Sequence, residues 1–223
     1  MAPVLKFYGH ACFQISQENN SIIIDPFLSD NPFKIAEPGQ IDVTHILITH
    51  GHFDHLGDAV KIAQKTGATI ISTAEIAHMC AEQGCQTHAM HIGGKHQFDF
   101  GYVRVTQAFH GSGAPGGHAC GFIVNFSGKK IYHTGDTGIF GDMQLLGRLE
   151  NIDYALVPIG DNFTMGPGDA VEAVGLIKPK AVVPMHYNTW PLIAQDPEKF
   201  RKEVENRYNI PVHIVAPGQS ISL

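Results

Sequence analysis

The sequence predicts an α/β fold in which two sheets face each other and helices cover their outer sides, a four-layer αββα sandwich with two similar β-rich halves. Apolar runs of strand length alternate with helical patterns along the whole chain. A short motif near the N-terminus also returns in the second half, which indicates that the two halves are related. Because no long linker or low-complexity segment interrupts the 223 residues, we expect residues 1–223 to form one domain.

Short runs rich in β-branched and aromatic residues predict the strands. Glycine or proline punctuates most junctions between elements, as at Gly67 and Pro179. The expected strands are Leu5–Ile15, Ser21–Asp25, His45–Thr49, Thr69–Ser72, Gln97–Ala108, Gly121–Phe126, Lys130–His133, Tyr154–Pro158, Ala181–Met185, Val212–Ala216 and Ser220–Leu223.

Segments with apolar residues at helical spacing predict the helices. Pro167 is well placed at the start of one of them, because the first helical position needs no backbone N–H donor. Thr164 is a candidate cap for the same helix. The expected helices are Leu56–Thr66, Ala74–Gln83, Gly141–Leu149, Pro167–Ile177 and Pro197–Tyr208.

The repeated motif is Gly-His-Ala-Cys-Phe at residues 9–13 and Gly-His-Ala-Cys-Gly-Phe at residues 117–122. Each copy opens an expected strand, which a polar turn separates from a second apolar strand. The second segment ends at an aspartate in both copies, Asp25 and Asp136. We interpret the match as a structural pseudo-repeat rather than a coincidence, although the match is only five residues long.

Composition narrows the class of protein. The formal net charge is −6 and no run of Lys or Arg stands out, which disfavours a nucleic acid as partner. None of the four cysteines forms a C-x-x-C pair, so we interpret them as buried thiols of a reducing compartment. No apolar run approaches the roughly 18 residues of a membrane helix, and we expect a cytoplasmic protein without membrane contact. The sequence makes no prediction of oligomeric state.

A ligand-rich turn follows the apolar strand that contains Ile46 and Ile48. Its pattern is H-x-H-x-D-H, with three histidines and one aspartate in six positions. Because alternate residues share a side in an extended chain, His50 and His52 are expected to hold one ion. Asp54 and His55 lie where a helix begins and can face a second ion. Imidazole together with carboxylate suits zinc, manganese, iron or nickel.

The pattern T-H-x-H-x-D-H over residues 49–55 resembles the signature of the metallo-β-lactamase superfamily. The resemblance extends over nearly the whole chain and implies further metal ligands at the ends of later strands, namely His110, Asp136 and His186. It also implies an aspartate after an early apolar strand, here Asp25, which would orient the ligating histidines. A simple turn-capping role beside Pro26 is the alternative for Asp25.

The resemblance implies two divalent metal ions, with zinc favoured over manganese, iron or nickel. His50, His52 and His110 would hold the first ion, and Asp54, His55 and His186 the second, with Asp136 between them. A hydroxide that bridges the ions would be the nucleophile. Asp54 would also orient that hydroxide, so we treat it as catalytic.

Two further histidines, His10 and His118, have more than one possible role. Short members of the superfamily, similar to sugar-phosphate lactonases, also open with a G-H-x-x-F stretch, which residues 9–13 match. His10 is therefore a candidate catalytic residue that shuttles a proton, with a buried structural role as the equal alternative. For His118 in the second copy, the structural interpretation is favoured.

The expected function is hydrolysis of a small, anionic ester, lactone or phosphoester. Two divalent cations attract anions, and free backbone N–H groups of Thr164–Gly168 at a helix start could hold one, unless this is an ordinary helix start. Trp190, after the last ligand, could line the pocket or lie in the core. The alternative function is a metal-dependent nuclease or phosphodiesterase acting on nucleic acid, which the missing basic stripe disfavours.

Overall fold

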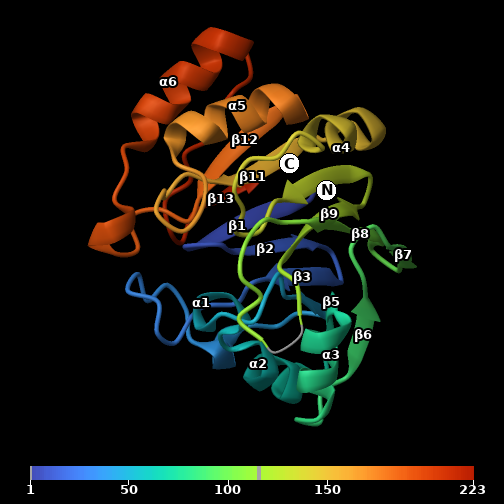
Figure 1. The fold of residues 1–223 in the computed structure, drawn as a ribbon. Coiled ribbons are helices and arrows are strands. Elements are labelled where there is room, and N and C mark those ends of the chain that lie inside the picture. The colour runs from blue at the N-terminus through green and yellow to red at the C-terminus, as the bar shows by residue number, and fades with distance from the viewer. Residues whose placement is uncertain (1, 115–116) are drawn as a thin grey trace.

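The computed structural model describes residues 2–114 and 117–223, and their strands form two sheets (Figure 1). The first sheet has the order β13-β1-β2-β3-β4-β5-β6, and the second has the order β12-β11-β10-β9-β8-β7. The strands of the first sheet are β1 Val4–Gly9, β2 Cys12–Gln17, β3 Asn20–Ile24, β4 His45–Leu47, β5 Thr69–Thr73, β6 Thr87–Met90 and β13 Ser220–Ser222. Those of the second are β7 Lys95–Phe98, β8 Gly101–Gln107, β9 Cys120–Phe126, β10 Lys129–His133, β11 Tyr154–Pro158 and β12 Ala181–Met185.

The helices lie on the outer faces of the two sheets, as Figure 1 shows. Helices α2 and α3 cover the first sheet, and α4, α5 and α6 lie over the second. Their bounds are α1 Phe53–Leu56, α2 Ala59–Thr66, α3 Ala74–Ala81, α4 Met143–Glu150, α5 Pro167–Ile177 and α6 Pro197–Tyr208, with short 3-10 turns η1 Pro38–Gln40 and η2 Pro191–Ile193. The expected αββα sandwich is therefore confirmed.

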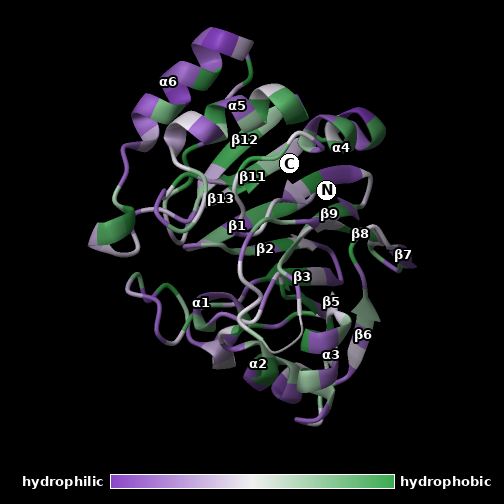
Figure 2. Ribbon diagram, in the orientation of Figure 1, coloured by the Kyte–Doolittle hydropathy of each residue, from purple (hydrophilic) through white to green (hydrophobic). Residues whose placement is uncertain are grey.

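Alternation along each strand divides the core into three layers. Ile22 and Ile24 point into the space between the sheets, whereas Ile23 between them packs under α2 and α3. In the second sheet Ile131 faces the inner core and Tyr132 faces the helices. This follows from the period of two in a strand, and it explains why buried hydrophobic side chains lie on both faces of each sheet. Figure 2 shows the mainly hydrophobic residues of β11 and β12 in green.

The two halves are built alike. Strand β2 pairs antiparallel with β3, which pairs parallel with β4. In the second half β9 pairs antiparallel with β10, which pairs parallel with β11. Phe13 lies opposite Ile24 in one half, and Phe122 lies opposite His133 in the other. The sequence repeat at residues 9–13 and 117–122 thus marks a repeat in the fold.

Three expected elements are broken by turns. Leu5–Ile15 is a hairpin, because Gly9 and His10 both have positive φ, 103° and 60°, and reverse the chain. Gln97–Ala108 falls across a second hairpin, in which Phe98 lies opposite Gly101. The helix expected over Leu56–Thr66 is interrupted at Gly57, where φ is 43° and a Cβ would lie 2.5 Å from the Pro26 carbonyl oxygen.

Two other differences concern weak strands. Val212–Ala216 is not a strand, because only Val212 forms a bridge, to Val182. Conversely, β6 at the edge of the first sheet was not expected from the sequence. Within the described ranges, no helix combines the length and hydrophobicity needed to cross a membrane.

Candidate metal centre

The loops that carry the candidate ligands leave both sheets at the same edge. Strands β1, β3 and β4 run in one direction in the first sheet, and β8, β10 and β12 share one direction in the second. The chain segments that follow these strands therefore meet at one end of the sandwich. They carry, in chain order, His10, Asp25, His50, His52, Asp54, His55, His110, Asp136 and His186.

The structure brings all seven predicted metal ligands together. In each of three overlapping groups, the ligand atoms lie within 4.8 Å of one another, close enough to hold an ion. The groups are His50, His52 and His110; His50, His55 and Asp136; and His10, Asp54, His55 and His186. The first and third reproduce the two sets expected from the sequence, with His10 added to the second.

The first group consists of three imidazoles that face one another. His50 Nε2 lies 2.9 Å from His52 Nδ1, and His110 Nε2 lies 3.3 Å from the same atom. Alternate positions in the extended segment 50–52 bring the first two together, while the third comes from the loop after β8. Three ring nitrogens converging on one point suit the tetrahedral preference of zinc, with the fourth position open.

Asp136 lies between the two sets of ligands. Its Oδ2 lies 2.9 Å from His186 Nε2, 3.2 Å from His55 Nε2 and 3.7 Å from His110 Nε2. Its Oδ1 is buried without a hydrogen-bond partner, as are His55 Nε2 and His186 Nε2. Buried polar atoms are nearly always satisfied by hydrogen bonds, so a cluster in which ring nitrogens and a carboxylate approach one another without such bonds fits a bound cation.

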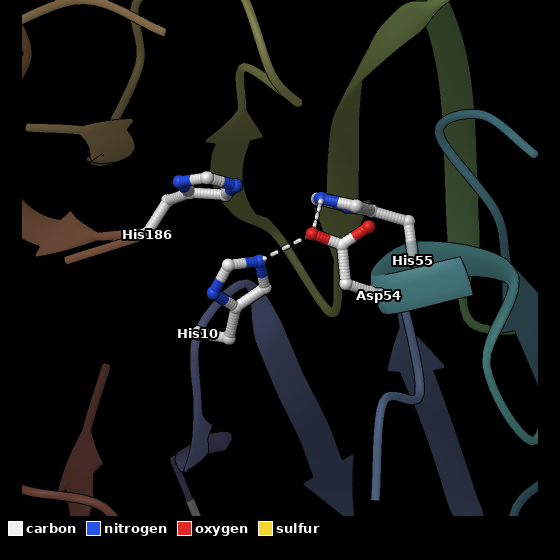
Figure 3. Close-up of side chains that lie close together, drawn as sticks. All are labelled: His10, Asp54, His55 and His186. Carbon is white, nitrogen blue, oxygen red and sulfur yellow. Dashed lines mark hydrogen bonds and ion pairs between the residues drawn. The ribbon is translucent and has the colours of Figure 1, made fainter. Parts of the chain in front are cut away.

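The remaining group places His10 beside Asp54 (Figure 3). His10 Nε2 lies 3.0 Å from Asp54 Oδ2, and His55 Nε2 lies 3.8 Å from the same oxygen. The opposite ring nitrogen of His10 lies 2.8 Å from Thr189 Oγ1. His10 thus connects a candidate metal ligand to a hydroxyl group, which neither the spacing nor the motif predicted.

Burial keeps two of the histidines neutral. It lowers the pKa of His50 to about 2, and it lowers the pKa of His10 to about 4, with His186 contributing in the same direction. A neutral imidazole is the form that binds metal. Both rings are therefore neutral at neutral pH, which for His50 is the form needed in a metal ligand.

The carboxylates remain charged in spite of their burial. Burial opposes the charge of Asp136, but the neighbouring His186 and His55 hold its pKa well below the usual value. For Asp54, burial is likewise outweighed, mainly by the hydrogen bond with His10, and the pKa is lowered. Burial disfavours the charge on His55, yet Asp136 and Asp25 raise its pKa. A cation bound beside His55 would replace the proton that gives the imidazole its positive charge.

Asp25 joins the signature segment to the sheet below it. The Thr49 backbone N–H donates to Oδ1 at 2.8 Å, and the Thr49 hydroxyl donates to Oδ2 at 2.6 Å. His55 Nδ1 lies 2.7 Å from the same Oδ2. These contacts support an orienting role for Asp25, since they fix which nitrogen of His55 faces the cluster.

Several site residues have a backbone conformation that L-residues rarely adopt. His10, Asp25 and His186 have φ values of 60°, 47° and 54°. Each lies directly after a strand, where the chain must turn sharply for its side chain to reach the cluster. Such local strain is typical of functional sites, and the surrounding sheets hold it in place.

The structure also bears on the expectations for His118 and for the segment 164–168. His118 is exposed and belongs to none of the ligand groups. Two donors of the expected anion cradle at Thr164–Gly168 are already used, because the Thr164 N–H donates to the Asp161 carbonyl and the Met165 N–H donates to the Thr137 carbonyl. The cap residue of α5 is Gly166 rather than Thr164. These contacts favour the alternative interpretation of the segment as an ordinary helix start.

A cavity of about 430 Å³ opens beside the ligand cluster. Its walls include candidate ligands and four apolar side chains, Phe53, Phe163, Trp190 and Leu192. Trp190 therefore lines the pocket. The other three were missed by sequence reasoning, although Phe53 stands inside the metal signature and could have been found there.

Comparisons with known proteins identify the family of this chain. The β-lactamase superfamily domain matches residues 4–186. A relative from Natranaerobius thermophilus is 52% identical over 219 residues, covering 98% of this chain and 99% of its own length. A relative from Bacillus thuringiensis is 46% identical over 228 residues, with 98% and 99% covered. Igni18, a metallo hydrolase from the archaeon Ignicoccus hospitalis, superposes with a TM-score of 0.92 at 35% identity, covering 100% of this chain and 99% of that one.

The fold, the ligand cluster and these matches define a metal-dependent hydrolase of the β-lactamase superfamily. The chain belongs, within it, to the family of UPF0173 metal-dependent hydrolases, to which the two relatives belong. The resemblance inferred from the signature is confirmed.

Proposed function

We propose that this hydrolase uses two divalent ions, with zinc favoured over manganese, iron or nickel, and cleaves a small ester, lactone or phosphoester. The observation that carries the proposal is the position of Asp136, whose Oδ2 lies within 3.7 Å of ring nitrogens from both ligand sets. His50, His52 and His110 would hold one ion, and Asp54, His55 and His186 the other. Bound ions would supply a hydroxide nucleophile near neutral pH and polarise the target carbonyl or phosphoryl oxygen.

Two residues of the chain would then orient the attacking water and transfer its proton. Asp54 faces the cavity and accepts a hydrogen bond from His10, so it is placed to orient the attacking water. His10 has Thr189 on its other nitrogen, which gives a chain of hydrogen-bonding groups leading away from Asp54. In this role His10 passes a proton between the site and Thr189. Hydrolysis adds water across the C–O or P–O bond, and it yields an acid and an alcohol from an ester, a single hydroxy acid from a lactone, and a phosphomonoester and an alcohol from a phosphodiester.

The test is a substrate panel with the zinc-loaded protein. The panel contains p-nitrophenyl acetate, γ-butyrolactone, bis(p-nitrophenyl) phosphate and a structured RNA. We expect hydrolysis of at least one small substrate that disappears on removal of the metal. A kcat/KM for RNA far above that of every small substrate, falling steeply with salt, would instead support a nuclease.

A further inference from the structure

The mouth of the candidate site is hydrophobic. Phe53, Leu192 and Phe163 expose 67%, 63% and 51% of their surface, and Trp190 is half-buried. Single exposed apolar residues are ordinary on a protein surface. Here, however, all four line one cavity that leads to the ligand cluster, and a patch of this kind marks a binding surface.

The buried ring of Phe27 supports two of the aromatic rings at the mouth, Phe53 and Trp190. The buried ring of Phe27 contacts Phe53 edge-on at 5.8 Å between centroids, and it lies 6.2 Å from Trp190. Phe53 and Trp190 are themselves 6.1 Å apart. Trp190 also contacts His10 edge-on at 4.9 Å. The aromatic wall is therefore preformed and continuous with the site, so little ordering is required when a ligand binds.

The other two apolar side chains, Phe163 and Leu192, lie on short loops that are attached to the rest of the molecule by hydrogen bonds or buried neighbours. Phe163 sits between the turn at Asp161 and Met165, whose N–H donates to the Thr137 carbonyl. Leu192 lies in η2, next to Ile193, which is fully buried. Both loops are anchored to the body of the molecule, so their exposed side chains keep their place at the mouth.

The charge of the lining distinguishes between classes of substrate. All remaining residues that line the cavity are candidate metal ligands: His52, Asp54, His110, Asp136 and His186. Among the described residues of the lining there is no Lys or Arg. Nothing at the mouth would therefore pair with a second negative charge on the substrate, although a single oxygen of the scissile group could reach the metal.

We propose that the substrate is an ester or lactone that carries an uncharged, apolar chain or ring, which packs against Phe53, Phe163, Trp190 and Leu192. This proposal names the substrate class for the proposed hydrolase and rests on that proposed function. It replaces the anionic substrate expected from the sequence, because the second support for an anion, the segment 164–168 at the start of α5, does not line this cavity.

The test is calorimetric binding of hydroxamates to the zinc-loaded protein. Acetohydroxamate and octanohydroxamate share the chelating group and differ in chain length. Each methylene fully withdrawn from water tightens binding about fourfold. At an open mouth we expect the equivalent of two or three of the six additional methylenes to be buried, so the longer compound should bind about 30-fold more tightly. A third compound, the monohydroxamate of suberic acid, ends in a carboxylate, and we expect it to bind at least about tenfold more weakly than octanohydroxamate.

Leu192→Ser and Phe163→Ser should each reduce the ratio between the long and short compounds severalfold. The matched control is Leu149→Ser, which removes a leucine of 53% exposure on α4, outside the cavity lining, and should leave the ratio unchanged. Equal affinity for both chain lengths, or tighter binding of the suberic compound, would overturn the proposal. Failure of acetohydroxamate to bind would count against the metal centre instead. In that case octanamide, which has the same chain without the chelating group, tests the pocket in metal-free protein: weaker binding to Leu192→Ser supports it, and equal binding refutes it.

Discussion

Asp25 Oδ2 lies 2.7 Å from Nδ1 of His55, and the opposite nitrogen of that ring lies 3.2 Å from Asp136. The Asp25 carboxylate at the end of β3 thus determines which nitrogen of the His55 ring points to the cluster. Asp25 also accepts two hydrogen bonds from Thr49, at the start of the signature. Asp25 thus links the two ends of the segment 49–55, which carries four of the seven candidate ligands.

Replacing Asp25 with Asn should weaken metal binding without removing a ligand. An amide has one acceptor atom where the carboxylate has two, so either Thr49 or His55 would lose its partner. We expect the zinc affinity to fall about 10- to 100-fold. Competition with a chromophoric chelator measures it. Asp58→Asn, at the position that binds the backbone of Leu28 and Ser29 near the surface, is the control. Unchanged zinc affinity in Asp25→Asn would refute the orienting role.

Asp54→Ala should remove activity and leave the fold intact. The side chain is at the cavity wall, where its loss costs little packing but removes one ligand and the partner of His10. We expect kcat to fall by at least about 100-fold, with an unchanged far-UV spectrum. Asp30→Ala, at an exposed position, serves as the control. A variant with near-normal kcat would contradict the role assigned to Asp54.

His10→Asn separates a proton shuttle from a structural histidine. Asparagine tolerates the positive φ of 60° at this position better than alanine does. As a shuttle, His10 should contribute about 100-fold to kcat while the metal content stays the same. The repeat offers a matched control, His118→Asn, at an exposed position. A loss of thermal stability with normal kcat would support the structural interpretation.

Glu150→Gln tests an ion cluster far from the site. The side chain of Glu150 is buried and accepts hydrogen bonds from Tyr102 at 2.6 Å and Arg104 at 2.8 Å. Burial opposes its charge, but these contacts lower its pKa below the usual 4.5. Its stabilisation is therefore complete above pH 4.5 and is lost as the pH falls through the lowered value.

At pH 7 the variant should lose about 1–3 kcal/mol in the free energy of unfolding. Urea denaturation at several pH values measures it, and the difference from the native protein should shrink below pH 4.5. The exposed Glu82→Gln is the control. A difference independent of pH would mean that the charge of Glu150 does not contribute.

Elements with clear boundary signals were predictable from the sequence. Both α5 and α6 begin and end at the expected residues, because a proline opens each and a left-handed residue, Lys178 or Asn209, follows it. The turn at Gly9 and His10 was missed because apolar residues flank it on both sides, although Gly9 itself is a turn signal. Edge strand β6 was missed because it is short and partly polar.

The clustering of the candidate metal ligands was predictable, because these residues follow apolar strands in a local pattern. The contact between His10 and Thr189 was not, because these residues are 179 positions apart. The apolar mouth was missed for a different reason. Phe163 and Leu192 look like core residues in a sequence, and only the fold reveals that they are exposed.

Metal stoichiometry tests the central claim most directly. The protein is saturated with zinc, freed of excess metal and analysed by elemental mass spectrometry together with His110→Ala and His186→Ala. We predict two ions in the native chain and about one in each variant, because each variant loses a ligand of a different ion. A native, folded protein that holds one ion or fewer at saturation would contradict the two-metal account.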